Sequence, residues 1–370
     1  MELLKRLTLE QGQSPWLDNL TRGYLRSGRL SQLIDDGIRG LTSNPTIFQK
    51  AIQGSADYDE QFARLVADGG AIVDQYWELV LRDIDDALEV FAPVHRASGG
   101  LDGFVSVEVD PGLAHDASGT ERAARMLHDR LDRVNLMVKI PGTEEGLQAI
   151  RTMISEGRSI NVTLIFSLDR HQRVMDAYLD GLEALAAARP DADLSLVASV
   201  ASFFISRVDT EVDRRLDAIA TPEALALRGR VAVAQAKLAY EQFRRTFSGP
   251  RWDALAARGA RVQRPLWAST STKNPTYRDT LYVDELIGPD TVNTLPDATI
   301  EAFADRGSVE RTIDRDVDEA HHVWAELSRV GVDIDEVSAV LEREGVASFR
   351  ASFDDLLAAL DAKASSMRPA

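Results

Sequence analysis

One lysine stands where a buried strand would normally carry an aliphatic side chain. Residues 135–143 read Asn-Leu-Met-Val-Lys-Ile-Pro-Gly-Thr, an apolar run that Pro141 and Gly142 bring to an end, as is typical of a short buried strand. Burial of Lys139 would lower the pKa of its ammonium, because desolvation disfavours the charged form. A neutral amine is a nucleophile and can form a Schiff base with a carbonyl substrate. Taken alone, the stretch is explained better as an exposed edge strand whose lysine prevents edge pairing.

Polar side chains recur in or beside several other apolar runs. Along the chain they are Asp18, Thr42, Asn44, Glu108, Lys139, Asn161, Thr163 and Ser202. Each unpaired buried charge would cost several kcal/mol, so their recurrence on six successive runs indicates a functional site. Two carboxylates with one lysine suit amine chemistry, since they supply a nucleophile and groups that move protons and activate water.

The elements that must position these side chains alternate along the chain. Apolar runs bounded by turn residues predict eight strands, at 14–20, 38–45, 103–111, 135–143, 160–167, 194–204, 264–270 and 291–296. Helical patterns separate them, and single helices are expected over 22–36, 119–133, 169–187 and 222–246. Between the second and third strands two helices are expected, and the second shows apolar residues at helical spacing from Val73 to Phe91.

This alternation predicts an α/β fold, a (β/α)8 TIM barrel. We expect one domain over residues 1–370, with a leading helix within 1–13 and a helical extension over about 310–370 that packs on the barrel. An open doubly wound sheet is the alternative, although the chain has no glycine-rich phosphate loop. In a barrel, side chains at the carboxyl ends of the strands converge on one face. Arg207 and Lys273 follow the sixth and seventh predicted strands on that face, where many barrels bind phosphate, although each alone could be an ordinary surface cation.

Composition excludes several classes of function. A net charge of −17 argues against a nucleic-acid groove and against binding to an anionic membrane surface. The absence of cysteine excludes disulfides and thiolate chemistry, and no histidine lies in a metal-ligand pattern. No GxSxG elbow occurs, which argues against Ser/His/Asp hydrolase chemistry. We therefore expect no metal and no cofactor. Residues 1–13 lack a signal-like apolar stretch and no segment approaches a membrane span, so a cytoplasmic location is expected.

Five stretches together carry a family resemblance. They are Gly40-Leu41-Thr42-Ser43-Asn44-Pro45-Thr46, Val107-Glu108-Val109, Val138-Lys139-Ile140-Pro141-Gly142-Thr143, Asn161-Val162-Thr163-Leu164-Ile165-Phe166-Ser167 and Asp290-Thr291-Val292-Asn293-Thr294. From about Trp16 to about Leu360 the chain resembles the transaldolases, specifically their longer bacterial branch. The resemblance implies a (β/α)8 barrel that transfers a dihydroxyacetone unit from sedoheptulose 7-phosphate to glyceraldehyde 3-phosphate, giving erythrose 4-phosphate and fructose 6-phosphate in the non-oxidative pentose phosphate pathway.

The same resemblance implies roles for individual residues. Lys139 matches the Schiff-base lysine and Asp18 the carboxylate that handles the proton during carbon–carbon cleavage. Glu108 and Thr163 match the pair that holds and activates the catalytic water. The remaining matches bind substrate: Asn44 and Asn161 by hydrogen bonds, Thr42 and Ser202 at further site positions, and Arg207 at the phosphate. Lys273 is a departure, because many members carry an arginine there, and lysine lacks the planar bidentate fork of arginine.

Two other functions remain open from the sequence. A class I aldolase would use nearly the same residues without passing the three-carbon unit to a second sugar. A non-catalytic barrel that only binds sugar phosphates is the other alternative, although the joint presence of Lys139, Asp18 and Glu108 argues against it. The expected partners are small sugar phosphates, with no nucleic acid and no membrane. The sequence does not distinguish a monomer from a homodimer.

Overall fold

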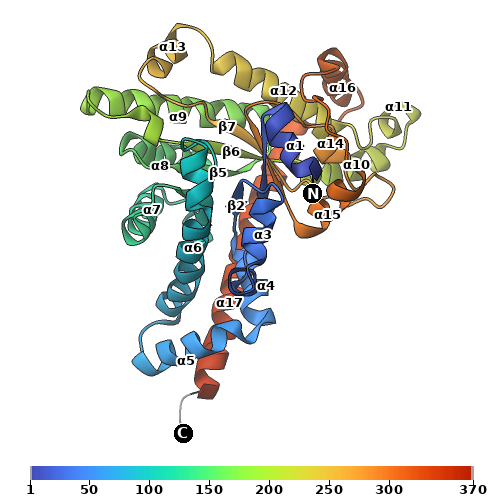
Figure 1. The fold of residues 1–370 in the computed structure, drawn as a ribbon. Coiled ribbons are helices and arrows are strands. Elements are labelled where there is room, and N and C mark those ends of the chain that lie inside the picture. The colour runs from blue at the N-terminus through green and yellow to red at the C-terminus, as the bar shows by residue number, and fades with distance from the viewer. Residues whose placement is uncertain (1, 368–370) are drawn as a thin grey trace.

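Eight parallel strands close into a barrel in the computed structural model, which describes residues 2–367 (Figure 1). The strands are β1 (Gln13–Leu17), β2 (Gly40–Thr42), β3 (Val105–Glu108), β4 (Leu136–Pro141), β5 (Ile160–Ile165), β6 (Ser199–Phe204), β7 (Arg264–Ala268) and β8 (Thr291–Leu295). Each strand pairs in parallel with the next, and β1 also pairs with β8. The predicted (β/α)8 TIM barrel and its eight strands are confirmed.

Helices connect and surround the strands. They are α1 (Glu2–Gln11), α2 (Arg22–Arg26), α3 (Arg29–Asp35), α4 (Pro45–Gly54), α5 (Asp59–Asp68), α6 (Ile72–Ala97), α7 (Ala117–Leu131), α8 (Glu144–Ser155), α9 (Leu168–Ala188), α10 (Ser206–Ile219), α11 (Pro222–Leu225), α12 (Val231–Thr246), α13 (Pro250–Ala256), α14 (Leu281–Asp284), α15 (Asp297–Arg306), α16 (Val317–Arg329) and α17 (Ile334–Met367). All strand residues are buried, because helices cover the outer face of a parallel barrel and side chains fill its interior.

Short turns follow several strands, and the helix after each turn begins at a capping residue. Asn44 caps α4 by accepting a hydrogen bond from the Ile47 N–H, and Pro45 occupies the first position of that helix. Thr143 caps α8 in the same way and Ser167 caps α9. These helices therefore begin within a few residues of the strand ends that carry the polar side chains.

The structure corrects some predicted boundaries. The single helix expected over 22–36 is two helices, α2 and α3, with Gly28 between them at φ 76°. The helix expected over 222–246 is likewise α11 and α12, separated at Gly229 with φ 70°. A left-handed backbone ends a helix, and glycine adopts it without strain. Three α-helices, not two, lie between β2 and β3, and the sixth strand begins at Ser199 because residues Leu194–Leu196 form a 3₁₀ turn.

The additional helices predicted at both ends are present. α1 lies against β1, and the extension predicted over about 310–370 contains α16 and α17. Figure 1 shows α17 as the long red helix running beside α4 and α6, against both of which it packs. No helix among residues 2–367 is both long enough and apolar enough to span a membrane.

Gly40 is a packing constraint at the start of β2. It pairs in register with the fully buried Trp16 of β1, and a Cβ at this position would lie 2.5 Å from Cε2 of the indole. Gly40→Ala is expected to lower the free energy of unfolding by about 1–3 kcal/mol, because overpacking displaces the ring or the strand. Denaturant unfolding measures this loss. Gly54→Ala is the control, since its Cβ would meet nothing within 4 Å; equal stability of the two variants would contradict the prediction.

Candidate active site

Three predicted site residues lie side by side on adjacent strands. The strand register pairs Glu108 of β3 with Lys139 of β4, and Lys139 with Asn161 of β5. Lys139 is 5% exposed; its Nζ donates a hydrogen bond to the Ser43 carbonyl oxygen at 3.0 Å and lies 3.1 Å from Oε2 of Glu108. β4 has a neighbour on each side in the closed barrel, so Lys139 does not protect a sheet edge. The alternative of an exposed edge strand is wrong.

Glu108 and Thr163 flank the lysine and keep hydrogen-bonding capacity. Burial raises the pKa of Glu108, an effect that the Lys139 ammonium partly opposes. Apart from the ion pair between Glu108 and Lys139, neither carboxylate oxygen of Glu108 nor the buried Oγ1 of Thr163 has a hydrogen-bond partner among the described residues. Thr163 precedes Leu164, whose φ is 59°, within a register irregularity between β5 and β6. Such irregularities often lie next to active sites, where they redirect a side chain.

Asp18 stands directly after β1, at the same face of the barrel. Its backbone N–H continues the strand pairing to the Leu295 carbonyl oxygen, and Oδ1 accepts a hydrogen bond from Oγ1 of Thr42 at 2.8 Å. Oγ1 of Thr42 also lies 2.6 Å from Oγ1 of Thr294. Burial raises the pKa of Asp18, whereas Lys139 and the Thr42 hydroxyl act in the opposite direction. Asp18 is therefore a second carboxyl whose proton affinity is increased in the same cavity.

The amide groups of the predicted ligands Asn161 and Asn44 already make hydrogen bonds within the protein, but each keeps some donor capacity. Asn161 donates from Nδ2 to Oγ of Ser106 at 3.1 Å, and its Oδ1 accepts from Oγ of Ser202 at 2.7 Å. These bonds fix the orientation of the amide and leave one Nδ2 hydrogen free to donate. Asn44 accepts the α4 capping bond through Oδ1 at 3.0 Å, so its Nδ2 is its remaining polar group.

Two cations, Arg207 and Lys273, line the cavity. Arg207 is in the first turn of α10, and Lys273 lies in the loop after β7, where its Nζ donates to Oγ of Ser271. Among residues 2–367, no carboxylate lies within 4.0 Å of the charged group of either. Burial lowers the pKa of Arg207, and burial followed by repulsion from Arg207 lowers the pKa of Lys273. Two unpaired cations that repel each other would be stabilised by an anion between them.

One cavity of about 130 Å³ collects most of these residues. It is lined by Asp18, Thr42, Asn44, Lys139, Thr163, Ser202, Phe204, Arg207, Ala268, Ser269, Ser271, Lys273, Thr294, Pro296 and Phe349. Eight of the ten predicted site residues are in this set; Glu108 and Asn161 are not, although both neighbour Lys139 in the sheet. Sequence reasoning missed Thr294, which its position in the eighth apolar run could have indicated. It also missed Phe204 and Phe349, which look like ordinary apolar positions of a strand and a helix.

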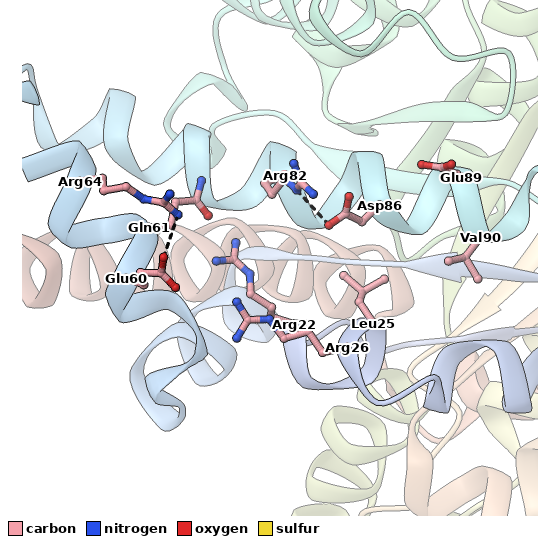
Figure 2. A pocket seen from close by; sticks show the side chains of 10 residues that line it. All are labelled: Arg22, Leu25, Arg26, Glu60, Gln61, Arg64, Arg82, Asp86, Glu89 and Val90. Atoms are coloured by element: carbon pink, nitrogen blue, oxygen red, sulfur yellow. Dashed lines mark hydrogen bonds and ion pairs between the residues drawn. The ribbon is translucent and has the colours of Figure 1, made fainter.

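A larger hollow lies away from these residues. Between α2, α5 and α6 a groove of about 610 Å³ is lined by four arginines (Figure 2). Each arginine already has a carboxylate partner: Arg22 with Asp83, Arg26 with Asp57, Arg64 with Glu60 and Arg82 with Asp86. An anion would have to compete with these carboxylates. The groove also lacks a nucleophilic side chain, so the smaller cavity is the candidate active site. Among the described residues no group of three or more histidine and carboxylate side chains could hold a metal ion.

The fold and this cavity define a class. Acidic, basic and amide groups gathered at the carboxyl ends of barrel strands are the arrangement of a (β/α)8-barrel enzyme. A profile of the family described as "Transaldolase/Fructose-6-phosphate aldolase" matches residues 15–360. The chain is 52% identical over 349 residues to the transaldolase of Frankia alni, covering 94% of this chain and 93% of that protein. It is 50% identical over 359 residues to transaldolase 1 of Streptomyces coelicolor, covering 96% and 93%, and 52% identical over 356 residues to the transaldolase of Mycobacterium ulcerans, covering 95% of each.

The chain therefore belongs to the transaldolase/fructose-6-phosphate aldolase family, and it is a transferase. The resemblance found in the five sequence stretches is confirmed.

Proposed function

We propose that this protein transfers a dihydroxyacetone unit from sedoheptulose 7-phosphate to glyceraldehyde 3-phosphate through a Schiff base on Lys139, in the non-oxidative pentose phosphate pathway. The products are erythrose 4-phosphate and fructose 6-phosphate. The observation that carries the proposal is the buried pair of Lys139 and Glu108, 3.1 Å apart beside a cavity that Arg207 and Lys273 also line. The names of the relatives agree with this reaction.

Formation of the Schiff base requires a neutral amine and a group that receives its proton. Glu108 is within reach, and a carboxylate whose pKa is raised by burial is a better proton acceptor than an ordinary one. The amine of Lys139 then adds to the ketone carbon of the donor, and a water molecule leaves as the imine forms. The free hydrogen-bonding capacity of Glu108 and Thr163 supports their role in holding that water and in activating it when the imine is hydrolysed.

Asp18 is proposed to act on the other bond that changes. It takes the proton of the C4 hydroxyl, the C3–C4 bond breaks, and the aldose product leaves. The electron pair of that bond is delocalised into the imine, so a three-carbon enamine stays on Lys139. When the acceptor aldehyde binds, the enamine carbon attacks it, and Asp18 returns its proton to the new hydroxyl. The raised pKa of Asp18 suits a group that must both take and return a proton.

The remaining predicted residues are proposed to hold the substrate. The free amide hydrogens of Asn44 and Asn161 can donate to substrate hydroxyls. Ser202 keeps the Asn161 amide oriented, and Thr42 does the same for Asp18. Arg207 and Lys273 would bind the phosphate, remote from the reacting carbons.

A transfer assay separates this function from that of an aldolase. With fructose 6-phosphate as donor, product formation should depend on added erythrose 4-phosphate as acceptor. Rapid release of free dihydroxyacetone without the acceptor would favour the aldolase instead. Absence of both reactions from the folded protein would support a barrel that only binds sugar phosphates.

Arg207 gives a test of the phosphate assignment. Arg207→Ala is expected to raise KM for phosphorylated sugars roughly tenfold to a hundredfold, since a charge-assisted contact contributes ~1.5–3 kcal/mol. The value of kcat should change much less, because the phosphate is far from the bonds that break. Lys273→Ala should have the same effect more weakly, and Lys273→Arg should be tolerated. Steady-state kinetics measure both constants; an unchanged KM in Arg207→Ala would show that the phosphate binds elsewhere.

A further inference from the structure

The C-terminal helix α17 lies across the mouth of the barrel. Near its beginning, Ser338 donates a hydrogen bond from Oγ to the Phe166 carbonyl oxygen, which directly follows β5. Further along, Oγ of Ser352 lies 2.7 Å from Oγ1 of Thr46 in the first turn of α4, which follows β2. The helix therefore bridges the ends of two strands from different sides of the barrel and passes over the candidate active site between them.

A glycine brings α17 unusually close to the strand ends. A Cβ at Gly345 would lie 2.9 Å from Cδ2 of Leu164 and 3.6 Å from both Nη1 of Arg207 and Cε2 of Phe166. Leu164 is the residue with positive φ that follows Thr163. The helix thus rests directly on the irregular end of β5, next to two residues of the site, and a larger side chain would lift it.

One helical turn further on, Phe349 covers the lysine. Its ring is 5% exposed and lines the cavity. The ring centroid lies 5.9 Å from Nζ of Lys139 and also 5.9 Å from Cζ of Arg207. The ring therefore stands against both the proposed covalent centre and the proposed phosphate-binding arginine. It has no polar group that could take part in proton transfer, so what it supplies is an apolar surface that excludes water.

Resting on the proposed function, we propose that Phe349 shields the three-carbon adduct on Lys139 from bulk water, beyond the one water that Glu108 and Thr163 hold, and so determines how much of it is transferred and how much is hydrolysed. In the hydrolytic branch, the enamine carbon takes a proton. It thereby becomes a hydroxymethyl group attached to the imine carbon. Water then adds to the imine carbon, and the C–N bond breaks. Free dihydroxyacetone and the lysine ammonium are released. In the transfer branch, the same enamine attacks the acceptor aldehyde before water reaches the imine.

The test is the ratio of two rates in one enzyme. With fructose 6-phosphate as donor, the release of free dihydroxyacetone without acceptor is compared with transfer to erythrose 4-phosphate. Phe349→Ala is expected to raise the ratio of release to transfer roughly tenfold or more, because the smaller side chain admits water. In Phe349→Leu, which restores apolar cover, the ratio of release to transfer should lie close to that of the unsubstituted enzyme. The ratio does not depend on how much of a variant folds, since both rates come from the same active molecules.

Two controls separate this proposal from general loss of packing and from the proposed function itself. Leu360→Ala removes a buried apolar side chain from the same helix without touching the cavity, and its ratio should stay unchanged. Borohydride trapping in the unsubstituted enzyme, mapped by mass spectrometry, shows whether Lys139 carries the adduct. An adduct on Lys139 together with an unchanged ratio in both Phe349 variants would overturn this proposal alone. No adduct on Lys139 of an active enzyme would overturn the proposed function and this proposal with it.

Discussion

Lys139→Met should abolish transfer and, with it, the covalent labelling of the protein by fructose 6-phosphate and borohydride. The side chain keeps a similar length and apolar character, so the strand can still pack, but the nucleophile is gone. Loss of a covalent nucleophile typically lowers turnover by a factor on the order of 10⁴–10⁶. In the unsubstituted protein, borohydride should reduce the imine and leave a three-carbon addition on Lys139, which peptide mass spectrometry locates.

A second buried lysine provides an internal control for this labelling. Lys237 of α12 is 6% exposed, and its Nζ donates to the Arg315 carbonyl oxygen at 2.9 Å. Burial lowers the pKa of Lys237, so desolvation alone would favour its neutral, nucleophilic form. It does not line the candidate cavity and has no carboxyl as near as Glu108 is to Lys139. Labelling of Lys237 in place of Lys139 in an active enzyme would contradict the assignment of Lys139 as the nucleophile.

Removal of Asp18 and removal of Glu108 should impair different steps of the reaction. Asp18→Ala is expected to form the imine with fructose 6-phosphate but to cleave it slowly, so a trappable six-carbon adduct should accumulate. Glu108→Ala is expected to slow formation and hydrolysis of the imine themselves. General acid–base groups typically contribute ~10²–10⁴-fold, so rapid-quench single turnovers resolve both defects. If Asp18→Ala accumulates only the three-carbon adduct at a normal rate, this division of labour is wrong.

The pH dependence of the unsubstituted enzyme tests the same assignment. As the proposed base, Asp18 must be ionised before cleavage, and burial raises its pKa. A raised pKa means that protonation, and so loss of the cleavage rate, begins at a higher pH than for an exposed aspartate. The acid limb of the single-turnover cleavage rate should therefore lie above the ordinary aspartate range. Glu108, whose pKa is also raised, should shift the acid limb of imine formation in the same direction.

The barrel and most of the candidate site could be predicted because both leave local signals. An apolar run ended by proline or glycine marks a strand wherever it occurs, and a charge within such a run is conspicuous. Lys139 and Glu108 were found in this way, and their adjacent register follows from the barrel. Helix breaks at Gly28 and Gly229 were missed, because a glycine within a helical pattern is tolerated often enough that sequence does not distinguish a break from a continuation.

Other parts of the site depend on contacts between distant segments. Phe349 belongs to a helix far along the chain, and its apolar character is what any core position of that helix would show. That Arg207 and Lys273 have no carboxylate partner among residues 2–367 is a property of packing, since many of the chain's other arginines are paired. The orientation of Asn161 by Ser202 is likewise a tertiary hydrogen bond. None of these tertiary contacts leaves a recognisable pattern in the amino-acid sequence.

The pairing of β1 with β8 has a consequence for how the protein acquires activity during folding. Gln13 Nε2 donates to Oγ1 of Thr291, 278 residues away in the chain, and the Asp18 N–H bonds to the Leu295 carbonyl oxygen in the same seam. Closing so long a loop is entropically unfavourable until many other contacts exist. A chain in which β1 has not yet paired with β8 could already hold Lys139 beside Glu108, but Asp18 would lack the backbone hydrogen bond to Leu295 that anchors it on this side. On the proposed mechanism, such an intermediate would bind a ketose at Lys139 but cleave it poorly, so full competence for cleavage would come only with the pairing of β1 and β8.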